Sequence, residues 1–197
     1  MQHFSTISGR SERGMTLVEL LIAMAILGVV MGGVTSGFVN QRKITAIQNQ
    51  RVVLIQQAQA AMDLVTRELR TAGTNPTGTA FVPVTYNASQ LEIRADLNGN
   101  GTTDTNNDLD EHLIYAYDSA NKRITRDAGS GAQPLVDNIQ TFTFRYLDSA
   151  GAETIVNNAI RQLQVTITAR TAAPDPKYKE NNGYRTFTMT SLIALRN

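Results

Sequence analysis

A single carboxylate stands inside the first apolar stretch of the chain. Gly14 is followed by residues 15–39, in which Glu19 is the only charged side chain. A carboxylate in a membrane-spanning helix costs about 2.5 to 3.5 kcal/mol on insertion scales, so it usually has a partner and a function. If such helices pack in parallel, a positive charge on one chain can neutralise Glu19 of a neighbour. Glu19 is therefore a candidate assembly contact.

Glu19 also has a simpler interpretation. In the first turn of a helix, a carboxylate suits the positive end of the helix dipole, and its side chain can reach the lipid headgroups. The order of the parts favours the assembly hypothesis. An ordinary secretory signal has its small-residue cleavage site after the apolar region, whereas Gly14 precedes it here.

A second set of oxygen-bearing side chains lies in residues 96–107, which read Asp-Leu-Asn-Gly-Asn-Gly-Thr-Thr-Asp-Thr-Asn-Asn. Oxygen-bearing residues recur at alternate positions and a glycine stands at position 6, as in a calcium-binding loop. The expected ligands are the side chains of Asp96, Asn98, Asn100 and Asp104 and the carbonyl of Thr102. The segment therefore predicts a structural Ca²⁺ site, and nothing in the sequence requires any other cofactor.

The segment departs from the calcium template at position 12, where Asn107 replaces the usual bidentate glutamate. Asp108, Asp110 or Glu111 can compensate with a different geometry. We refer to residues 96–111 as the acidic loop.

Charge and turn chemistry support two different interpretations of the acidic loop. Six acids and no lysine or arginine lie between Arg94 and Lys122, so this stretch repels itself unless a cation is bound. The alternative is a solvated hairpin loop, because Asn98-Gly99 and Asn100-Gly101 are good turn dipeptides. Both interpretations are open at the level of sequence.

The junction Arg13-Gly14-Met15-Thr16-Leu17-Val18-Glu19 resembles the class III signal of type IV pilins and type II secretion pseudopilins. In that family a prepilin peptidase cuts after the glycine and methylates the new amino terminus. The resemblance implies that residues 1–14 are a leader peptide and that Met15 is the N-methylated mature terminus. Met15 departs from the phenylalanine that is usual there. Glu19 occupies the family's assembly position.

Within the family, the chain most resembles PilW-type minor pilins, with J-type pseudopilins close behind. The resemblance rests on chain length, the acidic loop and the ending at residues 191–197. It implies a minor pilin that takes part in type IV pilus assembly or priming, at or near the filament tip. The alternative is a J-type minor pseudopilin of type II protein secretion. A membrane-anchored, calcium-dependent adhesin or DNA-capturing tip protein is an alternative of a different class.

The resemblance also implies partners and a location. The partners are the prepilin peptidase/N-methyltransferase and other pilins or pseudopilins, which contact the N-terminal helix. The location is the bacterial inner membrane, with one span, a cytoplasmic N-terminus and a periplasmic head, and later a cell-surface pilus (fimbrium) or periplasmic pseudopilus. Arg10 and Arg13 before the apolar run and Arg42 and Lys43 after it leave the positive-inside rule nearly balanced. The orientation therefore rests on the resemblance.

The residues that follow Gly14 have the pattern of one long helix. Residues 15–39 are long enough to cross a hydrocarbon core of about 30 Å, which predicts a transmembrane or filament-core helix. Gly28, Gly32, Gly33 and Gly37 form two small-xxx-small spacings that allow close helix packing. The alternative is that membrane helices simply tolerate glycine.

The helical pattern continues through residues 40–72, the predicted amphipathic helix of the head. Apolar residues recur at three- and four-residue spacing, interrupted only by Arg51. They are Ile44, Ile47, Leu54, Ile55, Ala58, Ala61, Met62, Val65 and Leu69. Gly73 and Asn75-Pro76 end the helix, which predicts one helix of some 55 residues in all.

Residues 73–197 have the pattern of a β-sheet head. Apolar and polar residues alternate in several segments, as in Leu163, Val165 and Ile167, which are separated by polar residues. The predicted strands are 81–86, 91–96, 112–118, 122–127, 139–147, 160–170 and 184–195. An antiparallel sheet on the carboxyl half of a long helix is an α+β fold of the type IV pilin kind.

Composition excludes several classes of function. The chain has 18 basic and 17 acidic residues, and loss of Arg10, Glu12 and Arg13 with the leader leaves 16 of each, so there is no convincing nucleic-acid site. Cysteine is absent, so an exported head needs no disulfide. There is no P-loop, GxSxG or HExxH pattern, and His112 is expected to be structural, so the chain is not expected to be an enzyme.

Overall fold

The computed structural model describes residues 14–104 and 110–195. In these residues it contains one α-helix, α1 (Leu17–Thr71), followed by eight strands and two short 3₁₀ turns, Asn157–Ala159 and Glu180–Gly183. The chain divides into two compact units, Met1–Ala46 and Ile47–Asn197, and α1 contributes residues to both. The second unit is called the head below.

The amino-terminal part of α1 is apolar and exposed. By length and composition, α1 is the one helix in the described part of the chain that is able to cross a membrane. Its most apolar stretch is wholly exposed. Two hydroxyl side chains in this part bond back to their own helix. Thr35 Oγ1 donates to the Met31 carbonyl at 2.7 Å, and Ser36 Oγ donates to the Gly32 carbonyl at 2.9 Å. Their polar atoms are thus satisfied without water.

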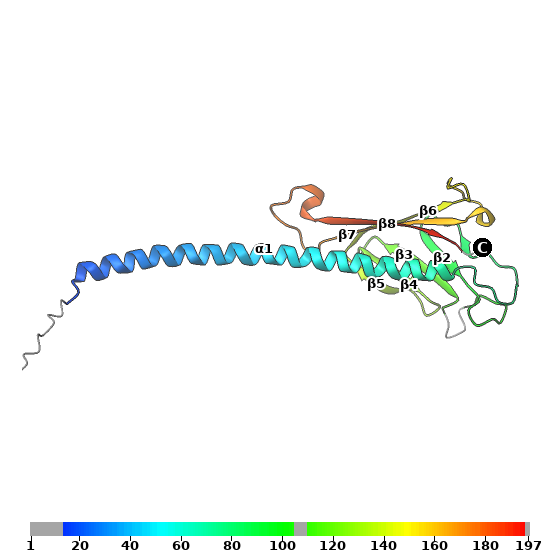
Figure 1. Cartoon of the computed structure of the whole chain (residues 1–197), viewed down its shortest axis with the longest axis horizontal. Coiled ribbons are helices and arrows are strands. Elements are labelled where there is room, and N and C mark those ends of the chain that lie inside the picture. Colours follow the sequence, from blue (N-terminus) through cyan, green and yellow to red (C-terminus); the bar gives the residue numbers. More distant parts are fainter. Residues whose placement is uncertain (1–13, 105–109, 196–197) are drawn as a thin grey trace, which may run out of the picture. The chain divides into compact units, whose positions relative to one another are not determined.

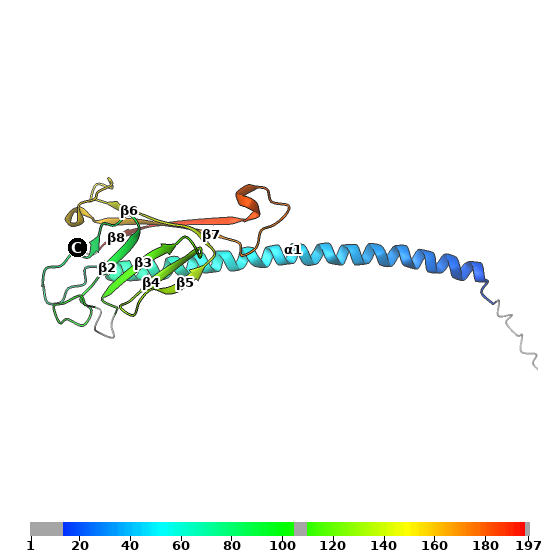
Figure 2. The same cartoon turned by 180° about the vertical axis from the view of Figure 1, so that it is seen from behind.

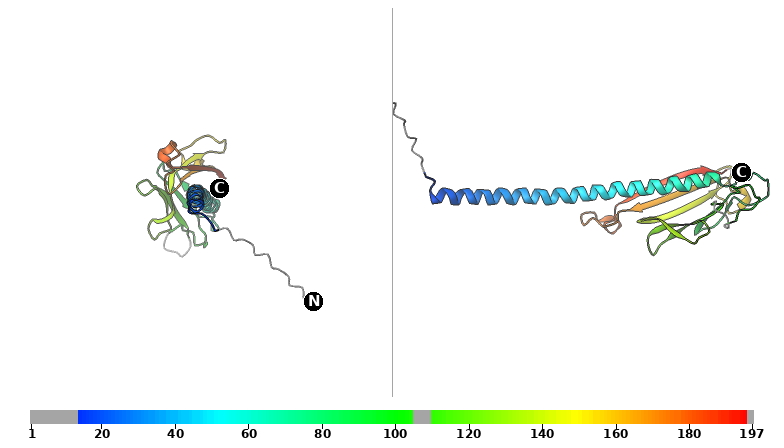
Figure 3. Two further views of the ribbon diagram at one scale, coloured as in Figure 1. Left: turned by 90° about the vertical axis from the view of Figure 1, so that its left-hand side faces the viewer. Right: turned by 90° about the horizontal axis from the view of Figure 1, so that it is seen from below.

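The carboxyl-terminal part of α1 packs into the head. Six side chains are buried at the predicted helical spacing, namely Leu54, Ala58, Ala61, Met62, Val65 and Leu69. The predicted apolar stripe began earlier, but Ile44 is 43% exposed, because the core uses this face of the helix only from Leu54 onward. Figures 1 and 2 show the strands alongside this part of α1, and the end-on view of Figure 3 places them around one side of it.

The strands form two antiparallel sheets, not the one sheet predicted. The first has the order β1-β2-β3-β4-β5 and the second the order β6-β7-β8. The first contains β1 (Val84–Thr85), β2 (Gln90–Arg94), β3 (His112–Asp118), β4 (Arg123–Asp127) and β5 (Gln133–Asp137). The second contains β6 (Ile139–Leu147), β7 (Gln162–Arg170) and β8 (Thr186–Ala194).

A single residue separates the two sheets along the chain. Asn138 lies between β5 and β6 and has φ 60°, a left-handed conformation that asparagine adopts more readily than most residues. The amide of Ile139 then donates to the Lys122 carbonyl, and the Asn138 carbonyl accepts from the Arg170 amide, both at 2.8 Å. This turn directs β6 away from the first sheet.

Two strands differ from the prediction because of proline. The predicted strand 81–86 is reduced to β1, and Pro83 just before it has no amide hydrogen to donate to a ladder. β5 was not predicted. It contains Pro134 and is tolerated because it is an edge strand of the first sheet.

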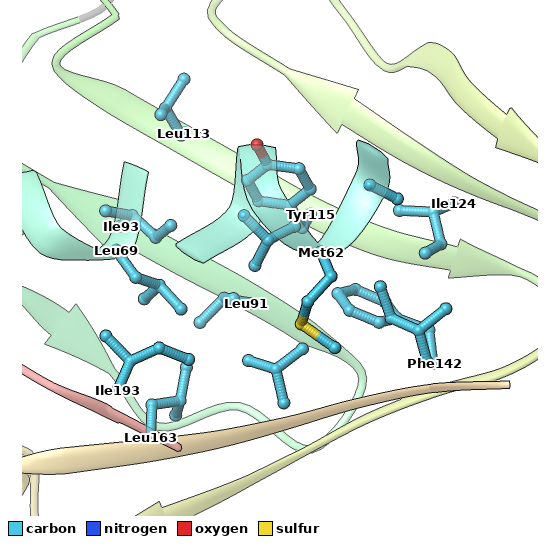
Figure 4. Close-up of a cluster of buried hydrophobic side chains, with 14 of the residues drawn as sticks. Met62, Leu69, Leu91, Ile93, Leu113, Tyr115, Ile124, Phe142, Leu163 and Ile193 are labelled. Atoms are coloured by element: carbon cyan, nitrogen blue, oxygen red, sulfur yellow. The ribbon is translucent and has the colours of Figure 1, made fainter. Parts of the chain in front are cut away.

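The core of the head lies between α1 and both sheets. Figure 4 shows Met62 and Leu69 of α1 among side chains of the first sheet, such as Leu91 and Tyr115, and side chains of the second, such as Leu163. The alternation predicted for β7 is confirmed, because its apolar side chains are fully buried and its polar ones are not. The predicted α+β class, with a long N-terminal helix on antiparallel strands, is confirmed.

One charged cluster also links α1 to the first sheet. Glu68 of α1 accepts hydrogen bonds from Arg126 Nη2 of β4 at 2.9 Å and from the hydroxyl of Tyr115 of β3. Arg126 Nη2 also donates to Asp110 at 2.6 Å. Burial, together with the Glu68 carboxylate, raises the pKa of Tyr115. The last turns of the helix are thereby fixed to the sheet by polar as well as apolar contacts.

Candidate functional site

Thr16 and Glu19 form a capping box at the start of α1. The Thr16 amide donates to Glu19 Oε2 at 2.8 Å, and the Glu19 amide donates to Thr16 Oγ1 at 3.3 Å. The Thr16 hydroxyl adds a bond to Glu19 Oε2 at 3.0 Å. This reciprocal pattern satisfies amide groups that have no partner within the helix. Glu19 therefore has the local role at the helix terminus that was the simpler interpretation of the sequence.

The capping box leaves part of the Glu19 carboxylate available. Glu19 Oε1 accepts no hydrogen bond from residues 14–104 or 110–195, and the whole side chain is exposed. Both residues of the box come after Met15, so cleavage after Gly14 would not remove them. Capping and an ion pair with a neighbouring chain are therefore compatible uses of one carboxylate.

The glycines of the helix face open space in the single chain. A Cβ atom added at Gly28, Gly32, Gly33 or Gly37 would have no neighbour within 4 Å, and the same is true at Gly14. The fold of one chain therefore does not require glycine at these positions. A packing requirement, if one exists, must come from other chains.

In the acidic loop, Asp96 is fully buried and organises the first turn. Its Oδ1 accepts from the amides of Gly99 at 2.7 Å and Asn100 at 3.1 Å. Its Oδ2 accepts from the Gly101 amide and from the Thr77 hydroxyl, both at 3.1 Å. The predicted first ligand is thus the centre of a compact turn next to the carboxyl end of α1.

The next predicted ligands continue the same pattern along the loop. Asn98 Oδ1 accepts from the Asn100 amide at 2.8 Å, and Asn100 Oδ1 accepts from the Thr102 amide at 2.8 Å. The Thr102 hydroxyl donates to Asp104 Oδ2 at 3.0 Å. Asp108 and Asn107 lie outside the described residues. Side-chain oxygens of the predicted ligands thus accept hydrogen bonds along one loop. The residues are Asp96, Asn98, Asn100, Thr102 and Asp104, of which Thr102 takes part as a donor.

Glu111 joins this loop from the start of β3. It is 1% exposed, and its Oε1 accepts from the amides of Leu97 at 2.9 Å and Asn98 at 3.0 Å. Asp110, the neighbouring acid, is bound instead to Arg126. Sequence analysis named Glu111 only as one of three substitutes for the missing glutamate. Within the described part of the chain, no group of three or more His, Cys, Asp or Glu is placed to hold a metal, so any site here must use amide and carbonyl oxygens as well.

Comparison with known proteins first identifies the N-terminal junction. Residues 9–35 match the prokaryotic N-terminal methylation motif, a stretch that includes Gly14, Met15 and Glu19. Residues 47–189, well over half of the chain, match the model of prepilin peptidase-dependent protein B. The chain belongs to the prepilin peptidase-dependent protein B family. The predicted membership of the type IV pilin and pseudopilin group is confirmed.

A solved structure of a type IV-like pilin from Thermus thermophilus is also similar to this chain. The two share 15% identity, with a TM-score of 0.44, and the match covers 72% of this chain and 96% of that one. No curated protein sequence matches significantly.

The family defines the class of function. The chain is a structural protein of the minor pilin and pseudopilin type. Its methylation motif implies processing by prepilin peptidase and assembly with other pilins. α1, which begins inside the motif, is apolar enough to anchor the chain in a membrane.

Proposed function

We propose that this protein is a minor pilin that primes type IV pilus assembly in the inner membrane and occupies a place at or near the filament tip. The observation that carries the proposal is the exposure of the apolar half of α1 directly behind a prepilin motif. Such a surface is stable in lipid, and a chain extracted from lipid must bury it against other chains. The tip position is what the resemblance to PilW-type minor pilins implies.

The proposal assigns separate roles to the residues of the junction. Gly14 precedes the bond that prepilin peptidase cuts, and Met15 carries the new, N-methylated amine. Glu19 Oε1 receives the amine of a neighbouring pilin while Oε2 keeps the cap of α1. Gly28, Gly32, Gly33 and Gly37 give neighbouring helices a close approach, which their open surroundings allow.

Processing is tested by intact-mass analysis of the membrane-bound protein, with the peptidase of the same bacterium present or deleted. The expected mature form lacks residues 1–14 and carries one added methyl group. Gly14→Val is expected to keep the full mass in both strains, because the substitution blocks cleavage. A normal protein that keeps its leader in the presence of the peptidase would exclude a pilin role.

Assembly is tested by cysteine cross-linking, for which the chain is suited because it has no cysteine of its own. Ser36→Cys is introduced in this chain and a single cysteine in the helix of each candidate partner. Cross-links to pilins are expected; cross-links to pseudopilins alone would support the J-type function in protein secretion instead.

The role of Glu19 is tested in the same assay by two substitutions of one capping box. Glu19→Gln should be cleaved but lose the cross-links, because the charge that pairs with the neighbouring amine is gone. Thr16→Ala removes the hydroxyl of the cap, keeps the carboxylate, and should retain the cross-links. Equal loss in both variants would mean that Glu19 acts only as a helix cap.

A further inference from the structure

The side chain of Glu111 has one carboxylate oxygen with no hydrogen-bond donor. Its Oε1 accepts two amide hydrogen bonds, but Oε2 is buried and has no partner among the residues that the structure describes. A buried carboxylate oxygen without a donor is costly, because water no longer solvates it. Such an oxygen indicates that a positively charged ligand completes the site.

The Glu111 carboxylate lies inside the acidic loop. β2 and β3 are antiparallel with Arg94 opposite His112, so the residues that follow β2 and precede β3 leave the same end of the sheet. The Ala95 amide donates to the Glu111 carbonyl at 2.9 Å, and the Glu111 side chain binds the amides of the next residues, Leu97 and Asn98. The first turn of the loop is therefore closed around this side chain.

Among residues 14–104 and 110–195, no basic side chain neutralises the two buried carboxylates at this end of the sheet. In the described residues, Asp96 and Glu111 form no ion pair. The neighbouring arginines are used elsewhere: Arg94 pairs with Glu92 at 2.6 Å, and Arg126 pairs with Glu68 at 2.9 Å and with Asp110 at 2.6 Å. Two buried acids without a counter-charge favour an external cation.

We infer that the described ends of the acidic loop, residues 96–102 and Glu111, bind one Ca²⁺ and that Glu111 takes the place of the glutamate missing from the twelfth position. The ligands are the side chains of Asp96, Asn98, Asn100 and Glu111 and the carbonyl of Thr102. Glu111 Oε2 accepts no hydrogen bond and Asn98 Oδ1 accepts one from the described residues, so both have a lone pair for a cation. The oxygens of Asp96 and Asn100 already accept two hydrogen bonds each, so the ion must displace some of these donors. An all-oxygen set with amides and a carbonyl suits Ca²⁺ better than Mg²⁺, which retains its waters, or a transition metal, which favours nitrogen or sulfur.

The bound ion would also stabilise the end of α1. The Asp96 amide donates to the Thr74 carbonyl at 2.8 Å, and the Thr77 hydroxyl donates to Asp96 Oδ2. Thr74 and Thr77 lie in the segment that follows the end of α1 at Thr71. Calcium held by Asp96 thus acts on the junction between the helix and the loop. This site is independent of the proposed role in pilus assembly.

The experiment uses the full chain, purified in detergent and treated with a chelator. Equilibrium dialysis with radioactive Ca²⁺ should give one ion per chain. Circular dichroism should show that the melting temperature rises by roughly 5–10 °C when free Ca²⁺ is a hundredfold above its Kd. Mg²⁺ at the same concentration should give a smaller rise. Absence of calcium binding, or an equal response to Mg²⁺, would overturn the inference.

Matched variants separate specific ligands from general negative charge. Glu111→Gln should raise the Kd for Ca²⁺ at least about tenfold, since a charged ligand is lost. Asp110→Asn removes the same charge one residue away and should leave the Kd nearly unchanged. Asn100→Ala, at an exposed position, provides a second ligand variant that keeps the core intact and should also weaken binding. Equal weakening by Asp110→Asn and Glu111→Gln would show that the loop attracts calcium only through its net charge.

Discussion

Gly183 determines the path of the long connection between β7 and β8. It is buried and has φ +87°, and a Cβ atom there would lie 2.9 Å from Pro174 Cβ and 3.2 Å from the Asp175 carbonyl oxygen. The Asp175 amide donates to the Gly183 carbonyl at 2.8 Å, and Arg185 Nη2 bonds to the Asp175 carboxylate at 2.9 Å. The connection is therefore closed at its base by backbone and ion-pair contacts around one glycine.

Gly183→Ala is expected to destabilise the head more than Gly151→Ala. Both glycines have a left-handed φ, but Gly151, at φ +80°, has no atom within 4 Å of an added Cβ. Each substitution costs about 1 kcal/mol of backbone strain, and Gly183→Ala adds about 1–3 kcal/mol from overpacking. Urea unfolding of both variants, followed by tyrosine fluorescence, measures the difference. Equal losses would mean that the connection relaxes around the new methyl group.

At the scale of single residues, the sequence predicts what a short motif contains and misses what the fold adds. Asp96, Asn98 and Asn100 could be named as candidate ligands because a calcium template is contiguous. Glu111 could be named only as one of three candidates, since its selection depends on β2 and β3 pairing so that it meets residues 97 and 98. Likewise, the sequence predicted a helix-terminal role for Glu19 but not its capping box with Thr16, nor the separate use of its two carboxylate oxygens.

Among the elements, α1 is joined to the first sheet by an ion pair that is largely shielded from water. The side chains of Arg126 and Glu68 are 20% and 15% exposed, whereas those of Arg145 and Glu153, which form another pair, are 60% and 61% exposed. Loss of one partner of a buried pair leaves the other without compensation. Surface pairs contribute little because water screens them.

Glu68→Gln should therefore lower the free energy of unfolding by about 1–3 kcal/mol. The substitution keeps the size of the side chain but removes the charge that faces Arg126 and the acceptor strength that serves Tyr115. Glu153→Gln, the exposed control, should cost about 0.5 kcal/mol or less. Chemical unfolding of both variants under the same conditions gives the comparison. A larger loss for Glu153→Gln than for Glu68→Gln would contradict this ranking.

The two sheets are linked by Tyr146 of β6. Its hydroxyl donates to the carbonyl of Asn87 at 3.0 Å or of Gln90 at 3.3 Å, next to and within β2, and its ring packs edge-on against Tyr86 at 5.2 Å. Burial raises the pKa of Tyr146 to about 12. In the unfolded chain the pKa of a tyrosine is about 10.

This pKa difference predicts a loss of stability at alkaline pH. Between pH of about 10 and 12 the folded state holds the Tyr146 proton and the unfolded state has lost it, so the free energy of unfolding falls as pH rises. The contribution is intact below about pH 10, and its full loss is on the order of 2–3 kcal/mol. Urea unfolding from pH 9 to 11.5 measures the slope. Tyr146→Phe should make it shallower, with Tyr115 responsible for a remaining part, and an unchanged slope would refute the assignment.

The elements differ in how well the sequence could predict them. α1 follows from a stripe of apolar residues that persists over many turns, and its observed length of 55 residues agrees with the prediction. β5 could not be found, because an exposed edge strand containing Pro134 lacks the apolar alternation that marks a buried strand. The division into two sheets depends on the backbone conformation of Asn138, which composition does not encode.

In the whole molecule, the exposed glycines predict a division of labour between the apolar part of α1 and the head. Replacing Gly28, Gly32, Gly33 and Gly37 together by alanine should leave the unfolding of the head unchanged, since no side chain of the same chain meets the new methyl groups. The helix itself gains propensity, about 1 kcal/mol per residue. Cross-linking to partner helices should decrease, because close approach is hindered.

The control for this prediction is a single replacement in the head, the other unit of the chain. Ala58→Gly, in the buried stripe of the head, should lower the stability of the head and leave cross-linking unaffected. If the four alanine substitutions changed the unfolding of the head, the two units would not be energetically separate.

The hydroxyls of Thr35 and Ser36 affect how the apolar part of α1 could move from lipid to a protein environment. Each donates its hydrogen to a carbonyl of its own helix. These groups therefore need no hydrogen-bond acceptor from lipid, water or a neighbouring chain. These two hydrogen bonds can stay the same whether the segment is surrounded by lipid or by protein. In the proposed assembly, extraction from the membrane would exchange one apolar environment for another, and helix packing and the charge at the amino terminus would determine its direction.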